Sequence, residues 1–158
     1  MQAKLTRILA VAAAAALVAG CGGGSDRLSK AEYEQVIQTD GRDARQAVTR
    51  ASGSITSPAT LPTQIAAAEN AVKKAADDLD AAKPPKDAEA DNHTIVVGLR
   101  TLQTELGKLR AAAKKHDIAA LQAAAAALQA SPEIKAAQRA AEDLKKKGYT
   151  VGALGQSG

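Results

Sequence analysis

The chain has 158 residues, the length of one ordinary domain, with 21 basic and 17 acidic residues and a formal net charge of +4. It contains two Tyr, two His and one Cys, and neither Phe nor Trp. These scarcities exclude a disulfide scaffold, a cysteine-rich zinc module and an aromatic platform for stacking nucleic-acid bases. They also leave few residues from which a catalytic site could be built.

The first twenty residues have the pattern of an export signal. Lys4 and Arg7 provide a positive start, and an apolar stretch over 8–19 follows them. This stretch is shorter than the roughly 20 residues that a helix needs to span a bilayer, but it has the length of a secretory hydrophobic region. We therefore expect residues 1–20 to be a signal peptide that the mature protein lacks, which also removes part of the positive charge.

The sequence Val18-Ala19-Gly20-Cys21 resembles the bacterial lipobox, in which a branched apolar residue and two small residues precede a cysteine. The resemblance implies that a signal peptidase recognises the first three residues and cuts before Cys21. It also implies that Cys21 carries diacylglycerol and a further acyl chain such as palmitate, and two or more chains anchor a protein stably. Residues 21–28 then form a flexible Gly/Ser tether. The alternative is an ordinary signal peptide with a chance cysteine, cut at an Ala-x-Ala-like site.

A helical domain is expected over residues 29–149. Ser29 and Glu32 form a capping box that begins its first helix. Apolar residues recur at helical spacing in four segments, which we place at about 29–52, 62–83, 87–115 and 117–147. Asp40-Gly41 interrupts the apolar stripe of the first segment, where a kink or a water-filled gap could occur.

The second and third segments carry coiled-coil-like seams, in which apolar residues alternate in steps of three and four. The seams are Ile65, Ala68, Val72, Ala75, Leu79, Ala82 and Ile95, Leu99, Leu102, Leu106, Leu109, Ala113. Gly98 and Gly107 in the third segment are predicted to permit close helix approach. Because alanine-rich seams bring helices close together, we also expect no deep cavity.

The last segment is predicted to begin with Asp117 as its N-cap and to be one helix broken at Ser131-Pro132. Its apolar face changes phase there, and the dipeptide is typical of an N-cap followed by proline in the first helical position. Gly148 is expected to end the helix in a left-handed conformation, with Tyr149 touching Leu144. Residues 150–158 are expected to be a flexible tail. Short connections between such segments predict an all-α, antiparallel, up-down-up-down four-helix bundle.

Three short stretches resemble small alanine-rich helical lipoproteins of high-GC bacteria. They are residues 28–33, the Pro84-Pro85 turn and the ending Gly148-Tyr149-x-x-Gly152. The resemblance spans most of the mature chain and implies a lipobox, a glycine tether and a helical domain. It implies no activity. Some such proteins carry a cysteine in the first helix, which this chain lacks.

No residue pattern predicts an enzyme, a metal site or a cofactor. His93 and His116 are far apart in sequence, and His116 is expected to complement a helix C-terminus as a cation. The stretch 87–92 resembles a calcium loop, but Asn92 replaces its turn glycine and Gly98 replaces its bidentate acid. The basic clusters lack aromatic residues, so we expect no nucleic-acid partner.

The expected topology places one end of the bundle next to the membrane lipid that holds Cys21. Five lysines would face the lipid at that end and could contact anionic headgroups: Lys83, Lys86, Lys145, Lys146 and Lys147. The opposite end carries the loop over 52–61 and the His116-Asp117 corner. Loops on rigid scaffolds are common recognition sites, so an envelope protein partner would dock there.

The leading functional hypothesis is a non-enzymatic module on the extracytoplasmic face of the cell membrane, anchored by lipid, that mediates interactions or supports envelope structure. The alternative is a carrier that holds a small ligand or metal inside the bundle. Asp40, Gly41 and His116 are the candidate positions for that second role.

Overall fold

The computed structural model describes residues 26–53 and 59–155. The predicted signal peptide, Val18 to Cys21, most of the tether and the end of the tail lie outside the described residues. The described chain forms five α-helices and two short 3-10 helices, and no strand occurs within it. They are α1 (Lys30–Gly53), α2 (Leu61–Ala81), η1 (Lys86–Ala88), α3 (Glu89–Lys115), α4 (Ile118–Ala130), α5 (Pro132–Lys146) and η2 (Gly152–Gly155). The all-α prediction is confirmed.

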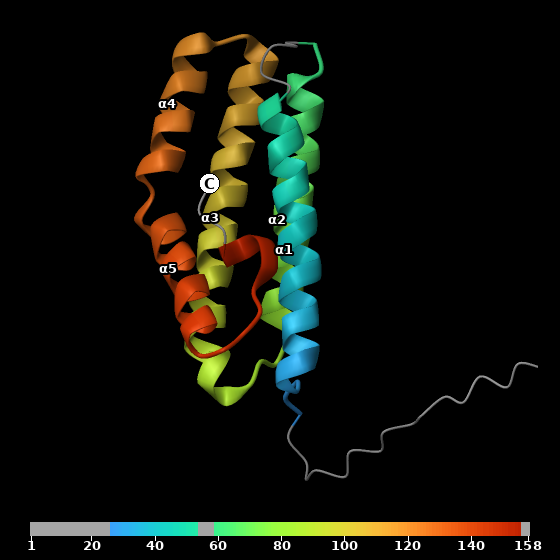
Figure 1. Cartoon of the computed structure of the whole chain (residues 1–158). Coiled ribbons are helices and arrows are strands. Elements are labelled where there is room, and N and C mark those ends of the chain that lie inside the picture. Colours follow the sequence, from blue (N-terminus) through green and yellow to red (C-terminus); the bar gives the residue numbers. More distant parts are fainter. Residues whose placement is uncertain (1–25, 54–58, 156–158) are drawn as a thin grey trace, which may run out of the picture.

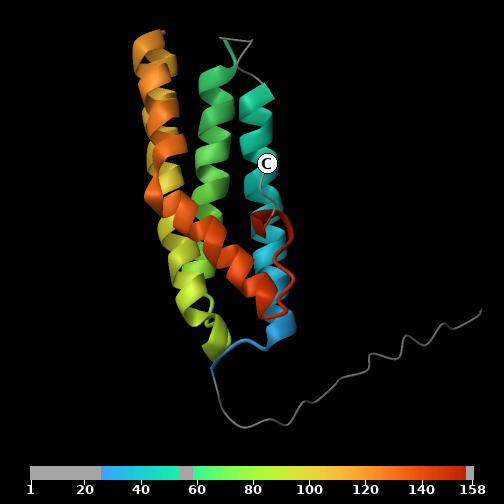
Figure 2. The same cartoon turned by 60° about the vertical axis from the view of Figure 1, so that its left-hand side comes forward.

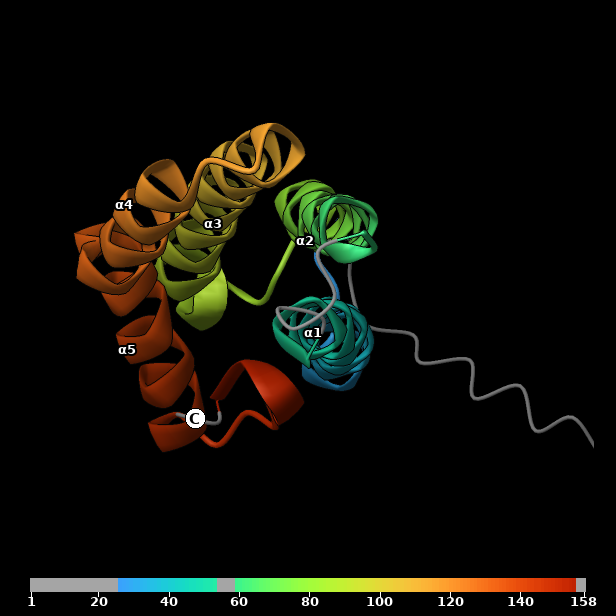
Figure 3. The same ribbon diagram turned by 90° about the horizontal axis from the view of Figure 1, so that it is seen from above.

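Helices α1, α2 and α3 run in alternating directions, and α4 and α5 together run antiparallel to α3 (Figures 1 and 2). α2 lies between α1 and α3, while α4 and α5 pack one after the other along α3. We call the end at which α1 begins, α2 joins α3 and α5 ends the N-terminal pole. The other end, where α3 turns into α4, is the distal pole. Seen from above, α5 and α1 stand apart (Figure 3). Residues 149–155, which we call the C-terminal segment, lie between them.

The helix starts follow the predicted capping residues. The Ser29 backbone N–H donates to Glu32 Oε2 at 2.8 Å, and the Glu32 N–H donates to Ser29 Oγ at 3.3 Å. The Asp117 side chain accepts from the Ala120 N–H at 2.9 Å at the start of α4. The Ser131 side chain accepts from the Ile134 N–H at 3.3 Å at the start of α5. The predicted break at Ser131-Pro132 therefore separates α4 from α5. Each cap satisfies a backbone donor that the first turn leaves without a partner.

The ends of α5 and α3 both use left-handed residues, only one of which was foreseen. Gly148 has φ 84°, and the Tyr149 N–H donates to Leu144 O at 2.9 Å, which confirms the predicted Schellman arrangement. His116 has φ 53° and forms the C-cap of α3. The His116 side chain is exposed at this end of α3.

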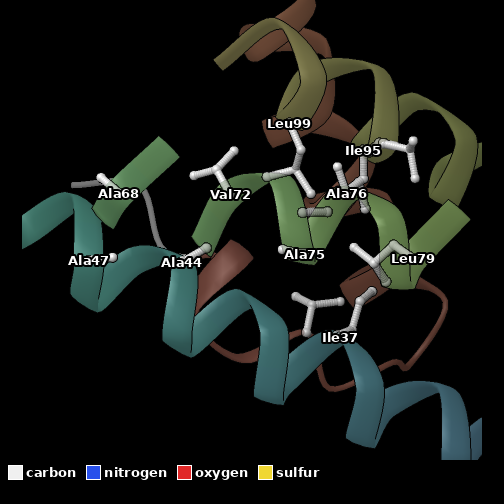
Figure 4. Close-up of a cluster of buried hydrophobic side chains, with 14 of the residues drawn as sticks. Ile37, Ala44, Ala47, Ala68, Val72, Ala75, Ala76, Leu79, Ile95 and Leu99 are labelled. Atoms are coloured by element: carbon white, nitrogen blue, oxygen red, sulfur yellow. The ribbon is translucent and has the colours of Figure 1, made fainter. Parts of the chain in front are cut away.

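The core is formed where α2 packs against α1 and α3 (Figure 4). Alanines line the contact between α1 and α2, with Ile37 and Leu79 pointing toward one another and Ile95 and Leu99 covering α2 from the other side. The largest fully buried side chains are Tyr33, Ile37, Val72, Leu79, Ile95, Leu144 and Val151. Small side chains therefore set the spacing of the helices, and a few large ones fill the remaining space.

Glycine has different roles at the two predicted positions of α3. A Cβ on Gly98 would overlap the Ala137 Cβ and lie 2.9 Å from the Glu133 carbonyl oxygen of α5. The prediction of close approach is therefore confirmed at Gly98. At Gly107 the nearest atom to such a Cβ is Glu69 Oε1 at 3.7 Å, an ordinary contact, so the prediction is wrong there.

A buried polar cluster joins the elements at the N-terminal pole. The Tyr33 hydroxyl donates to Asn92 Oδ1 at 2.9 Å, and Asn92 Nδ2 donates to the Leu79 carbonyl at 2.9 Å. The Tyr149 ring meets the Tyr33 ring edge-on at 5.9 Å between centroids, and its hydroxyl donates to Asp87 Oδ1 at 2.8 Å. This cluster ties α1, α2, α3 and the C-terminal segment together.

Parts of both segments predicted to be flexible at the ends of the domain belong to the fold. Val151 is 1% exposed, and η2 packs on α1 and α5, so the tail is part of the fold through residue 155. Arg27 donates to the Pro84 carbonyl at 2.9 Å, and the Leu28 N–H donates to the Lys83 carbonyl at 2.7 Å. The last part of the predicted tether is therefore bound to the turn between α2 and η1.

We predict opposite effects for the same substitution at the two glycines of α3. Gly98→Ala should lower the free energy of unfolding by about 1–2 kcal/mol, because overpacking against the α5 backbone exceeds the gain in helix propensity. Gly107→Ala should raise it by up to about 1 kcal/mol, since the methyl group fits. Urea unfolding followed by circular dichroism measures both values. Equal effects at the two positions would contradict the packing described here.

We also predict that the two tyrosines resist titration while the protein is folded. Burial, followed by the hydrogen bond to Asp87, raises the pKa of Tyr149 to about 12 from its usual 10.0. Burial raises the pKa of Tyr33 further. An unfolded tyrosine loses its proton near pH 10, so stability is lost progressively as pH rises from about 10 to about 12.

Tyrosinate absorbance and helical circular dichroism, followed together during alkaline titration, test this expectation. The absorbance should rise only as the helical signal falls. Tyr149→Phe serves as the comparison, because its remaining tyrosine, Tyr33, is the more deeply buried one. Tyrosinate formation near pH 10 in a fully helical protein would contradict the prediction.

Candidate ligand-binding groove

α4 presents its larger apolar side chains to a space that the other helices leave open. It packs against α3 and makes no extensive contact with any other described helix. Ala124 is the only buried residue within α4, all of which the structure describes. Leu121 and Leu128 are half-buried, and Ile118 is 64% exposed. α4 therefore attaches to α3 through a small side chain, while its leucines border the opening.

The open space is a groove of about 440 Å³, which we call the α4 groove. It lies between α4, the end of α1, the start of α2 and the second half of α3. Its lining is aliphatic apart from Ser52, Gln122 and Gln129. The aliphatic lining residues are Val48, Ala51, Leu61, Ile65, Leu102, Leu106, Leu109, Leu121, Ala125 and Leu128. No charged side chain lines this groove within the described chain.

A second apolar cavity of about 330 Å³ adjoins the α4 groove toward the N-terminal pole. The two spaces share Val48 and Leu102 in their linings. Leu154 of η2 lies at the border of this cavity, and a Cβ on Gly41 would lie 2.7 Å from the Leu154 Cγ. The C-terminal segment thus limits the apolar space where α5 and α1 stand apart.

The incomplete packing between α4 and the other helices has a physical reason. Alanine side chains bring α4 close to α3, but they are too short to reach α1 and α2 across the bundle. The predicted seam residues Leu102 and Leu109 consequently remain half-buried, unlike Leu106 beside them. Apolar side chains from several elements then face one shared space without filling it.

At Asp40-Gly41, where the apolar stripe of α1 is interrupted, the structure has an ion pair rather than a pocket. α1 passes through it as a continuous helix, and Asp40 is 6% exposed. Lys74 of α2 donates to Asp40 Oδ1 at 3.1 Å and also pairs with Asp78. Burial raises the pKa of the Asp40 carboxyl, while the Lys74 ammonium acts in the opposite direction. Asp40 does not line either apolar space, whereas Gly41 borders the smaller one.

The other candidate positions are dispersed over the surface. His93 and His116 are both exposed, and neither lines the groove or the adjoining cavity. In residues 26–53 and 59–155, no group of three or more His, Cys, Asp or Glu side chains could hold a metal ion. Cys21 and its lipobox neighbours lie outside the described residues.

The five lysines predicted to face lipid do gather at the N-terminal pole, but acidic groups accompany them. Lys83 pairs with Asp26 at 3.1 Å. Lys147 pairs with Asp91 at 2.6 Å and also donates to the Asp87 carbonyl at 2.7 Å. Lys146 pairs with Asp143 at 2.8 Å on its own helix; Lys86 and Lys145 are exposed. The pole therefore carries interleaved charges of both signs.

Comparisons with known proteins add no relative: no protein-family model, curated protein or solved structure matches the chain. None of the described helices is long and apolar enough to cross a membrane. The inference about function therefore depends on the groove itself.

Sequence reasoning did not identify the groove, although one signal was present. The leucines at 121 and 128 of α4 lie on one face, and only alanines share that helix's remaining core-facing positions. Helix α3 meanwhile offers leucines at 102, 106 and 109, more apolar surface than an alanine-rich neighbour can cover. This mismatch of volumes between facing helices predicts incomplete filling.

Proposed function

We propose that this domain binds the hydrocarbon chain of a small amphipathic ligand in the α4 groove. One observation carries the proposal: an apolar space of about 440 Å³ is bordered by ten aliphatic side chains from four helices. Small-molecule sites have volumes of about 300–1,000 Å³ and are mostly apolar, with a few polar groups that orient the ligand. Ser52, Gln122 and Gln129 supply such groups beside the groove.

The free energy of burial in the groove favours a ligand with a hydrocarbon chain over a compact polar ligand. Burying a methylene contributes about 0.8 kcal/mol, so affinity should increase with chain length until the groove is filled. A polar ligand would lose its hydration without gaining partners, because the lining offers few hydrogen-bonding groups. In this form, the carrier hypothesis places the ligand in the α4 groove rather than at Asp40 or His116.

We also propose that the domain acts at the extracytoplasmic face of the cell membrane, anchored through lipid on Cys21 and without a catalytic role. The lipobox-like sequence and the preceding apolar stretch support this proposal. Residue 26 lies at the N-terminal pole, where Asp26 pairs with Lys83, so the chain arrives from that side. The α4 groove opens in the distal half, away from the anchoring end. Contact of the five lysines with lipid is part of the same proposal.

The groove proposal predicts that saturated alcohols of increasing chain length bind with increasing affinity. Leu121→Gln should weaken binding of hexadecanol about fivefold, because about 1 kcal/mol of apolar contact is lost at this half-buried position. Ile118→Gln is the matched control: it lies on the same helix, is exposed and does not line the groove. Displacement of a fluorescent apolar dye measures both affinities.

Two results would contradict the groove proposal. One is the absence of binding by every alcohol in the series. The other is an equal loss of affinity in the Leu121→Gln and Ile118→Gln proteins. If the alcohols fail to bind while an envelope protein copurifies with the domain and protects Leu121 from exchange or labelling, the groove is a protein-docking surface instead.

The anchor proposal predicts that the full-length protein, extracted from its own membrane, begins at Cys21 and carries diacylglycerol and an acyl chain in its mass spectrum. Cys21→Ala should shift the protein out of the membrane fraction, because the thiol that accepts the lipid is absent. Gly22→Ala, which keeps the thiol, should remain in that fraction. An unmodified mature chain that begins at another residue would refute the anchor.

A further inference from the structure

The α4 groove and the adjoining apolar cavity follow one another along α1. In order toward the N-terminal pole, the apolar lining consists of Ala51 of the groove, the shared Val48, and Ala44 and Gly41 of the cavity. These positions are three or four residues apart, so they lie on one face of the helix over successive turns. The two spaces therefore have a continuous apolar wall on α1.

Helix α3 provides the facing wall in the same order. Its lining residues are Leu109 and Leu106 of the groove, the shared Leu102, and Leu99 and Ile95 of the cavity. At the rise of an α-helix, about 1.5 Å per residue, Leu109 to Leu102 spans about 10 Å and Leu109 to Ile95 about 21 Å. An extended octyl chain is about as long as the first span, and a hexadecyl chain is about as long as the second. The groove and the cavity together thus match one long hydrocarbon chain.

Leu154 of the C-terminal segment closes the far end of this path. Gly41 is the lining residue of α1 nearest the N-terminal pole, and Leu154 lies against it. A Cβ on Gly41 would lie 2.7 Å from Leu154 Cγ and 3.2 Å from Leu154 Cδ1, so the glycine provides the space that this side chain occupies. Leu154 is half-buried and borders the cavity. Its side chain therefore stands where the end of a long chain would arrive.

The backbone around Leu154 is held by contacts that do not involve its side chain. Arg45 of α1 donates to the Ala153 carbonyl at 3.2 Å. The Thr150 N–H donates to Glu34 Oε1, also of α1, at 3.0 Å. A substitution at position 154 consequently changes the size of the side chain at the end of the cavity and keeps the hydrogen bonds that attach the segment to α1.

We propose that Leu154 limits the length of the hydrocarbon chain that the domain accepts, and that the ligand is a long-chain amphipath with a chain about as long as hexadecyl. This inference rests on the proposed function of the α4 groove and specifies its ligand class. Ser52, Gln122 and Gln129 line the groove and not the cavity, so the polar end of the ligand lies in the groove and its methyl end lies against Leu154. Each methylene adds affinity only while it enters an apolar space.

The test measures the affinities of octanol, dodecanol, hexadecanol and octadecanol, delivered from cyclodextrin, by displacement of a fluorescent apolar dye. In the unsubstituted protein, affinity should rise by up to about fourfold for each added methylene and stop rising near hexadecanol. Leu154→Ala should bind octadecanol at least about fivefold more tightly, because the shortened side chain admits further methylenes. Leu154→Phe should weaken hexadecanol at least about fivefold, because the larger ring occupies the end of the path. Octanol, which the groove alone accommodates, should bind equally to all three proteins.

Val151→Ala is the matched control. It removes apolar volume from the same C-terminal segment, but Val151 is 1% exposed and lines neither apolar space. This variant should keep the chain-length limit of the unsubstituted protein. Circular dichroism verifies that each variant is folded.

The outcomes separate this inference from the function on which it rests. If the alcohols bind but neither Leu154 variant changes the chain-length limit, the role of Leu154 is overturned and the groove proposal stands. An equal change in Val151→Ala and Leu154→Ala also overturns it, because the effect would then come from loosening of the segment. The absence of binding by every alcohol overturns the groove proposal itself, and this inference with it.

Discussion

The close packing of helices through small side chains is the constraint on which the rest of this structure depends. Gly98 lets α3 contact the backbone of α5, and facing alanines of α1 and α2 bring those helices together. Close spacing buries the facing alanines, but it supplies little side-chain volume. Large residues must therefore fill the core at a few points, and Tyr33, Ile37 and Leu79 do so near the N-terminal pole.

The same constraint leaves the distal half incompletely filled. α4 follows α3 closely through alanine, and its leucines face α1 and α2 without reaching them. Closer to the N-terminal pole, the C-terminal segment inserts Val151 and Leu154 where α5 stands apart from α1. The chain thus closes one half of the bundle with its own end and leaves the other half open. An open apolar space bordered by rigid helices suits a ligand that supplies the missing volume.

The position of the groove agrees with an anchored binding domain. The chain enters at the N-terminal pole, where the Tyr33–Asn92 pair and the paired lysines hold the elements together. The groove lies along the side of the bundle, beyond that pole. Stabilising polar contacts and proposed ligand contacts therefore occupy different parts of the molecule, so substitutions in the groove can change binding without removing the cluster that holds the fold.

The sequence by itself determined the features that depend on neighbouring residues. The caps at Ser29, Asp117 and Ser131, the end at Gly148 and the helix boundaries all follow from local hydrogen bonding and apolar periodicity. Tertiary structure alone decided which apolar faces would be covered. The Asp40–Lys74 pair, the ordered segment through residue 155 and the α4 groove depend on the distances between helices, and those distances are set by side-chain volumes on both partners. Periodicity marks a face as apolar, but it does not reveal whether the opposite face is large enough to fill the space between them.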